Sequence, residues 1–313
     1  MLQRVTNETM QRSTLRNFQT NLSAMATLQA QLSSGKKIQV PSDDPSATGQ
    51  DLALRATQSQ LGQYTRNAQD GDSWLTMVDT ALTSSLGYLR NARDLVVQSG
   101  DAGLGQDSRD ALADNIDALK EALLQQANTR YQGRTVFAGT SDAGAAFTED
   151  DSGATPAYTW TGVPGATVDR RIGAESTVRV DTDGSQAFGL QQTTTNPDGT
   201  TTTTQSTVFA LLDQISAGLR AGHAVTSSLN DIDASMQNLL TAASSNGGRQ
   251  KVVENTLSEI SSQTLTVQGQ RSNVEDIDLA STIMNLQMQQ VTYQASLSAG
   301  SHVLQPSLLE FLQ

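Results

Sequence analysis

The chain has 313 residues, a formal net charge of −12 and no cysteine. The lack of cysteine excludes disulfide bonds and thiolate metal sites. The acidic balance argues against nucleic-acid binding, which needs patches of Lys and Arg to neutralise phosphates. Because no apolar run reaches the roughly 18 residues of a membrane-spanning helix, we expect neither a nucleic-acid nor a membrane partner. The first residues show no apolar signal region, so we expect any export to use no cleaved signal.

The segment between residues 7 and 33 is predicted to be a helix with one narrow apolar stripe, interrupted at Gln29. A matching stripe, interrupted at Gln290, lies between residues 279 and 304. This alternation of three- and four-residue steps is typical of a coiled-coil seam. A narrow seam on a short helix is marginal in isolation, so we predict that the two ends pair and that neighbouring subunits complete the packing. The alternative, one bundle formed within a single chain, stays open. The expected subunit-assembly residues are Leu15, Phe18, Leu22, Met25, Leu32, Leu279, Ile283, Leu286, Tyr293, Leu297 and Leu304.

Gly35 is predicted to end the first helix, because glycine favours the position just after a helix. Residues 35–44 are then expected to form an ordered turn, with Asp44 capping a second helix whose first residue is Pro45. The second helix is predicted to continue to Ser99, the longest helical signal in the chain. Its expected seam is Leu61, Tyr64, Ala68, Gly71, Leu75, Val78, Leu82, Ser85, Leu89, Ala92 and Val96.

A glycine-rich break at 100–105 precedes another predicted helix, which continues to about residue 130 with a seam of Leu112, Ile116, Leu119 and Leu123. The pattern then changes to short β-prone stretches at 135–137, 158–160, 168–172 and 177–180, separated by turn residues. A tight turn between threonine-rich arms is expected at 193–200. Because several aromatic residues also fall between 131 and 188, we predict a small, compact β-rich domain over 137–205.

Helical spacing resumes near Thr207, falters at 218–223, and continues towards the last helix. Gly247 and Gly248 form a weak point that is either a break or a fragile turn of helix. The predicted fold is mainly α, with a long antiparallel helical coiled-coil bundle made by the N- and C-terminal segments and a small β-rich insertion in the middle. The expected domains are a terminal segment (1–44 with 272–313), a helical bundle (45–136 with 206–271) and a β-rich outer domain (137–205).

Candidates for catalysis are few. His223 and His302 are expected to be exposed structural residues, and Asp43 and Asp44 are explained by helix capping. Residues 181–184 resemble the start of a calcium loop, but Gln192 stands where the loop needs glutamate, so a simple turn is expected. We therefore predict no catalytic, cofactor or metal site, and no enzyme. Tyr158 and Trp160 leave open an alternative, a recognition module or adhesin whose middle domain binds a ligand.

The turn after the first helix resembles that of the flagellin superfamily, through its residues Leu32, Ser33, Ser34, Gly35, Ile38, Asp43 and Asp44. The acidic segment 274–280 and the closing stretch 294–312 are similar to the same family, so that the resemblance covers about 1–140 and 207–313. Pro41, Pro45 and the segment 133–139 resemble the branch of the family that joins the flagellar hook to the filament. Thr135 departs from that branch, which often has an aromatic residue there.

The resemblance implies a structural component of the bacterial flagellum that is secreted by the flagellar type III route. It implies terminal segments that are disordered in the monomer and pair on assembly. The implied partners are other copies of the chain in a ring or tube, an adjacent hook-associated protein, flagellin and an export chaperone. The alternative within the same family is a flagellin that forms the filament itself.

Overall fold

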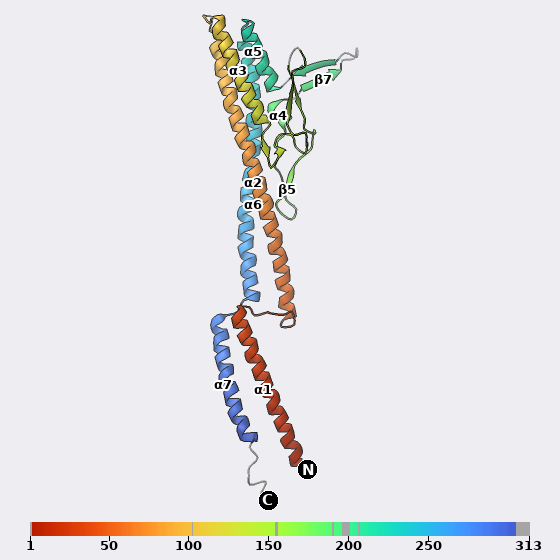
Figure 1. The fold of residues 1–313 in the computed structure, drawn as a ribbon, viewed down its shortest axis with the longest axis vertical. Coiled ribbons are helices and arrows are strands. Elements are labelled where there is room, and N and C mark those ends of the chain that lie inside the picture. Colours follow the sequence, from red (N-terminus) through yellow and green to blue (C-terminus); the bar gives the residue numbers. More distant parts are fainter. Residues whose placement is uncertain are drawn as a thin grey trace. The chain divides into compact units, whose positions relative to one another are not determined.

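The computed structural model describes residues 2–101, 103–153, 156–189, 191–195, 201–205 and 207–304 (Figure 1). The helices are α1 (Leu2–Ser34), α2 (Pro45–Ser99), α3 (Gln106–Ala127), α4 (Gly184–Phe188), α5 (Val208–Arg220), the 3₁₀ turn η1 (Thr226–Ser228), α6 (Leu229–Glu275) and α7 (Leu279–Leu304). The strands are β1 (Arg130–Tyr131), β2 (Arg134–Thr135), β3 (Phe147–Asp150), β4 (Ala157–Trp160), β5 (Asp169–Arg171), β6 (Thr177–Arg179), β7 (Gln191–Thr195) and β8 (Thr201–Gln205). The predicted fold class, mainly helical with a β-rich insertion, is confirmed.

The chain divides into two compact units. Unit 1 holds residues 1–60 and 263–313, and unit 2 holds residues 61–262. In unit 1, α1 and α7 run side by side in opposite directions (Figure 1). Unit 2 contains the longer parts of α2 and α6, together with α3, α5 and the hairpins.

The seam predicted for α2 is confirmed at every position, because all eleven residues from Leu61 to Val96 are buried. The apolar side chains of this seam from Ala68 to Val96 pack with α3, α5 and α6 into one core. On α3, Leu112, Ile116 and Leu123 are buried as expected, and Leu119 packs against the same core. An unbroken three–four register therefore identified the inner face of the longest helix.

The predicted end of α3 near residue 130 is wrong by about one turn, because Asn128 redirects the chain. The Asn128 side-chain oxygen accepts hydrogen bonds from the backbone N–H groups of Ala146 (2.7 Å) and Phe147 (2.8 Å). Its amide donates to the Phe147 carbonyl at 3.0 Å. The chain then forms the β1–β2 hairpin, whose two turn residues Gln132 and Gly133 both have positive φ, at 49° and 82°. Such a pair matches the right-handed twist of a hairpin.

The β region consists of four separate two-stranded antiparallel hairpins, β1–β2, β3–β4, β5–β6 and β7–β8. Strands were expected near β2, β4, β5 and β6, whereas β1, β3 and α4 were not foreseen. The threonine-rich arms pair as β7 and β8, and the turn expected between them lies partly outside the described residues.

Aromatic rings join this β region to the helices. Phe147 and Tyr158 from the hairpins both contact Phe209 of α5, with ring centroids 5.2 and 5.4 Å apart. Phe188 of α4 stacks on the same ring at 5.9 Å. The β region and the helices of unit 2 therefore share one core rather than two.

The weak point expected at Gly247 and Gly248 is not a break, since α6 continues through both glycines. Asn246 just before them is fully buried, and its amide donates to the Leu75 carbonyl of α2 at 2.9 Å. The seam continues on both sides through Leu239 and Val253. Packing against α2 therefore outweighs the low helix propensity of the glycine pair.

Candidate assembly interface

The turn between α1 and α2 is as ordered as the sequence predicted. Gly35 has φ +72° and follows the last residue of α1. The Asp43 carboxylate accepts hydrogen bonds from the backbone N–H groups of Gln39 and Val40, both at 3.0 Å, and these bonds lower the pKa of Asp43. Asp44 caps α2 by accepting from the Ala47 N–H at 3.0 Å. Asp44 thus caps the helix as expected, whereas Asp43 bonds within the turn and does not cap α2.

The turn meets the acidic segment near the C-terminus. The Lys37 N–H donates to the Glu275 carbonyl at 2.7 Å, and the Ile277 N–H donates to the Gly35 carbonyl at 3.1 Å. Lys36 and Asp276 form the short antiparallel bridge between them. Two segments almost 240 residues apart in sequence therefore join where α1 ends and α7 begins.

Glu275 is the centre of an ion-pair cluster at this junction, and its side chain is only 5% exposed. It contacts Lys36, Arg55 Nη2 at 2.6 Å and Arg271 Nε at 2.9 Å. The contact with Lys36, followed by those with Arg271 and Arg55, outweighs burial and lowers the pKa of Glu275 to about 2. Asp51 joins the cluster through Arg55 Nε at 2.7 Å. The Glu275 carboxylate thus links the turn after α1 and the turn before α7 to α2 and α6.

The faces of α1 and α7 that pack together are less apolar than the stripes read from the sequence. The half-buried positions on α1 include Phe18, Asn21, Met25, Leu28 and Leu32. On α7, Thr282 is buried, and Leu286, Gln289, Tyr293 and Ser296 are half-buried. Phe18 and Tyr293 meet edge to face with centroids 6.4 Å apart.

The predicted assembly residues therefore divide into two groups. Five of them are half-buried: Phe18, Met25, Leu32, Leu286 and Tyr293. Another five are exposed: Leu15, Leu22, Leu279, Ile283 and Leu297. The side chain of Leu304 lies outside the described part of the structure. The role of all these residues in assembly stays a prediction.

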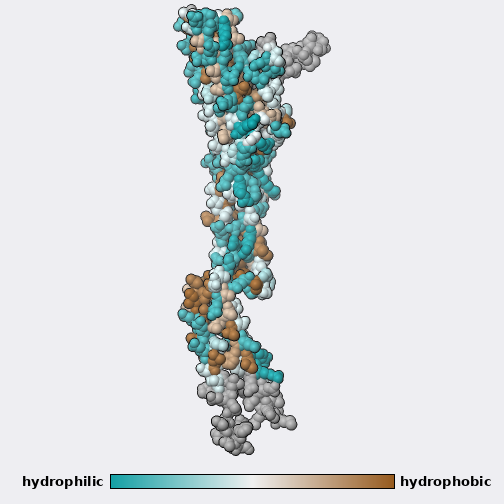
Figure 2. All heavy atoms as spheres, in the orientation of Figure 1, coloured by the Kyte–Doolittle hydropathy of each residue, from teal (hydrophilic) through white to brown (hydrophobic). Residues whose placement is uncertain are grey.

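Exposed apolar side chains continue around α7. Met284, Met288 and Val291 are 61–66% exposed and lie on the side of α7 away from its half-buried face, while the exposed Leu279 and Ile283 lie on its flank. Figure 2 shows the hydrophobic surface gathered over the first turns of α7. Met284, Met288 and Val291 do not belong to the predicted stripe, because they lie on the opposite face of α7. Clustered apolar side chains on the outside of a protein are typical of a surface that another molecule covers.

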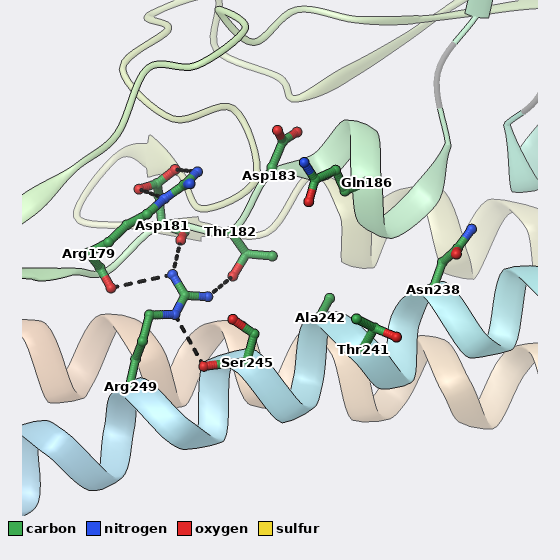
Figure 3. Close-up of a pocket in the computed structure, with 10 residues that line it drawn as sticks. All are labelled: Arg179, Asp181, Thr182, Asp183, Gln186, Asn238, Thr241, Ala242, Ser245 and Arg249. Carbon is green, nitrogen blue, oxygen red and sulfur yellow. Dashed lines mark hydrogen bonds and ion pairs between the residues drawn. The ribbon is translucent and has the colours of Figure 1, made fainter.

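A second candidate site is a polar hollow of about 400 Å³ in unit 2, between α6 and the segment from β6 to α4 (Figure 3). Arg249 of α6 reaches across it and donates to the carbonyls of Asp181 at 2.5 Å and Arg179 at 3.4 Å. It also donates to Thr182 Oγ1 at 3.1 Å. Burial, aided by the charge of Arg179, lowers the pKa of Arg249. Because its donors are taken up by protein oxygens, Arg249 fastens the β region to α6.

The calcium-loop resemblance at 181–184 is explained by these structural contacts. Asp181 is buried, pairs with Arg179 at 2.8 Å and accepts from the Val168 N–H at 2.7 Å. Asp183 caps α4 through the Ser185 N–H at 2.9 Å. Among the described residues, no group of three or more His, Asp or Glu side chains could hold a metal ion.

The remaining polar candidates are also structural. His223 is exposed, as expected, whereas the side chain of His302 lies outside the described residues. Tyr158 is buried, and its hydroxyl lies 2.6 Å from both Glu149 and Asp213. Lys120 binds Asp213 at 2.9 Å. In the described part of the chain, no helix has both the length and the apolarity to cross a membrane.

Comparison with known proteins agrees with this arrangement. The bacterial flagellin N-terminal helical region matches residues 5–142, and the flagellin C-terminal helical region matches residues 229–312. Flagellar hook-associated protein 3 of Escherichia coli is 28% identical, over 95% of this chain and 98% of its own. A Bacillus subtilis flagellin is 24% identical, over 91% and 90% of the two chains. The crystal structure of the flagellar junction protein FlgL from Legionella pneumophila has the same fold, with a TM-score of 0.57, 15% identity, and coverage of 73% of this chain and all of that one.

Proposed function

Because this chain belongs to the bacterial flagellin family, we propose that it is a structural subunit that joins the flagellar hook to the filament. The similarity to hook-associated protein 3 supports this role, since it extends over nearly the whole of both chains. The junction role includes secretion and a place in the extracellular flagellum, without catalysis. Its partners are other copies of the chain, an adjacent hook-associated protein and flagellin, with an export chaperone before assembly.

The observation that carries the proposal is the exposed apolar surface of the two terminal helices. Leu22 of α1 is 50% exposed and Met288 of α7 is 66% exposed, although both belong to helices that already pair. Burying such a side chain contributes about 1.5–3 kcal/mol. Several of them on one pair supply a driving force for association that a single chain leaves unused.

The test replaces these exposed residues with a charge. Leu22→Asp and Met288→Asp should each stop incorporation of the secreted chain at the tip of the hook, because a carboxylate is costly in an apolar contact. Unit 2 should keep its thermal unfolding profile, because both positions lie in unit 1. The matched controls are Asn17→Asp and Asn285→Asp, which place the same charge at exposed polar positions of the same helices. Normal incorporation of the Leu22 and Met288 variants would refute assembly through these faces.

Deletion of the gene separates the junction role from that of a filament flagellin. Loss of a junction subunit should leave hooks without filaments and release unassembled flagellin into the medium. Loss of a filament flagellin should leave the junction in place and remove the released protein. The number of copies per flagellum gives a second measurement, with few copies expected for a junction.

A further inference from the structure

The contact between α1 and α7 contains a polar layer in its middle. Asn21 Nδ2 donates to Ser296 Oγ at 3.4 Å, and Gln289 Nε2 donates to the backbone and side-chain oxygens of Asn21, both at 3.3 Å. The rings of Phe18 and Tyr293 pack next to this layer. At 3.3–3.4 Å these hydrogen bonds are long, so each contributes little to stability.

Helices α1 and α7 could also pack through a second seam, which is more apolar than the observed one. On α1, Phe18, Met25 and Leu32 belong to both seams, whereas Asn21 in the observed seam would give way to Leu22. On α7, Gln289 and Ser296 would give way to Gln290 and Leu297, and Thr282 to Ile283. Since successive residues are about 100° apart around a helix, a rotation of each helix by roughly 50° exchanges the two seams.

Burial of apolar surface within one chain favours the unobserved rotation. It would remove the apolar side chains of Leu22, Ile283 and Leu297 from water, which is favourable in proportion to the area buried. The observed rotation gives up that gain and keeps the three side chains exposed. Only the observed rotation brings Asn21 and Gln289 together.

We propose that Asn21 and Gln289 are positioning residues that select this rotation of α1 on α7. A polar pair in a coiled-coil seam fixes register at a cost in stability, because the alternative arrangement separates the partners. Here the selected arrangement turns the apolar faces outward, where neighbouring subunits bury them. The inference rests on the proposed assembly function and assigns the choice of face to two named side chains.

The first test compares two double variants of the full-length chain. Asn21→Ala with Gln289→Ala removes the polar layer, and incorporation at the hook should fall by about tenfold or more, the equivalent of 1.4 kcal/mol. The control is Asn17→Ala with Asn285→Ala, which makes similar substitutions at exposed positions of the same helices and should incorporate normally. Equal incorporation of the two double variants would overturn the proposal.

The second test measures the rotation directly, which is possible because the chain has no cysteine of its own. Leu22→Cys with Gln290→Cys places thiols one residue beyond the polar pair, where they face each other only in the alternative rotation. Their disulfide should form more readily when Asn21 and Gln289 are both alanine than when they are native. Phe18→Cys with Tyr293→Cys, shared by both seams, is the positive control. Equal disulfide yields in the two backgrounds would also overturn the proposal.

The two proposals fail in distinguishable ways. If Leu22→Asp and Met288→Asp incorporate normally, the apolar faces do not drive assembly, and the proposed function loses its support. A different result would be that the Leu22 and Met288 variants fail to incorporate but the double variant at Asn21 and Gln289 assembles normally. In that case assembly through the apolar faces stands, and only the positioning role is wrong.

Discussion

Replacing Glu275 with glutamine should destabilise both the turn after α1 and the turn before α7. The change keeps the size of the side chain but removes the charge that gathers Lys36, Arg55 and Arg271. Those three cations would then repel one another around a neutral amide. The backbone bridge between the turns, from Lys37 to the Glu275 carbonyl, depends on this cluster to hold the two segments together.

The size of the effect follows from the pKa of Glu275. A fall from the ordinary value of 4.5 to about 2 corresponds to about 3 kcal/mol of stabilisation at neutral pH. Lys36 is 39% exposed and Arg55 is 50% exposed, so solvent screens their attraction and the free cations regain hydration. We therefore expect Glu275→Gln to cost about 1–2 kcal/mol.

Hydrogen exchange in the assembled particle measures this loss where it occurs. The protection factors of the Lys37 and Ile277 amides should fall by about 5–30-fold, the ratio that 1–2 kcal/mol represents, while the amides of α3 and α5 stay unchanged. Glu254→Gln is the matched control, because Glu254 forms an exposed pair with Lys251 at 3.0 Å. Unchanged protection at Lys37 and Ile277 would refute the central role of Glu275.

The same carboxylate predicts a pH dependence. Because the pKa of Glu275 is lower in the folded chain, its contribution is complete above about pH 4.5 and is lost as the pH falls towards about 2. Protection of the two turns in the native chain should therefore decrease across this window. The Glu275→Gln chain should begin with lower protection and lack this component of the decrease.

Three further predictions concern the thermal unfolding of unit 2. Gly247→Ala with Gly248→Ala should raise its stability by up to about 1 kcal/mol for each residue, since an added Cβ meets open space at both positions. An unchanged or lower Tm would show that a neighbouring surface approaches there. Asn246→Asp should destabilise it by about 3–5 kcal/mol at neutral pH and recover in acid, because a buried carboxylate would face the Leu75 carbonyl. Tyr158→Phe should cost about 1–3 kcal/mol through loss of the hydroxyl shared by two carboxylates, and a Tm equal to that of the native chain would contradict this.

The sequence was sufficient for the long helices and their caps. Pro45 and Ser99 bound α2 as predicted, and Asp44 caps it by accepting from the Ala47 N–H at 3.0 Å. These features depend on neighbours three or four residues away. Local spacing therefore carries the information that determines them.

Polar side chains that connect distant segments cannot be predicted from local spacing. Asn128, Asn246 and Arg249 all bond to backbone groups that only the tertiary fold brings within reach. The sequence identifies Glu275 only as part of an acidic segment, because two of its three cations, Lys36 and Arg55, come from positions more than 200 residues away. Helix α4 has five residues, too few to establish a period.

The terminal helices show that apolar spacing does not determine which face of a helix packs within the chain. On α2 the spacing rule succeeded because partners within the chain bury the entire stripe. On α7, apolar residues occur on the seam, at Leu286, and on the outer side, at Met284 and Met288. A helix that is apolar on more than one face needs more than one partner, and α1 can cover only one of those faces. Spacing alone indicates that such faces exist, while the choice of the face that stays within the chain is made by the hydrogen bonds of the polar layer.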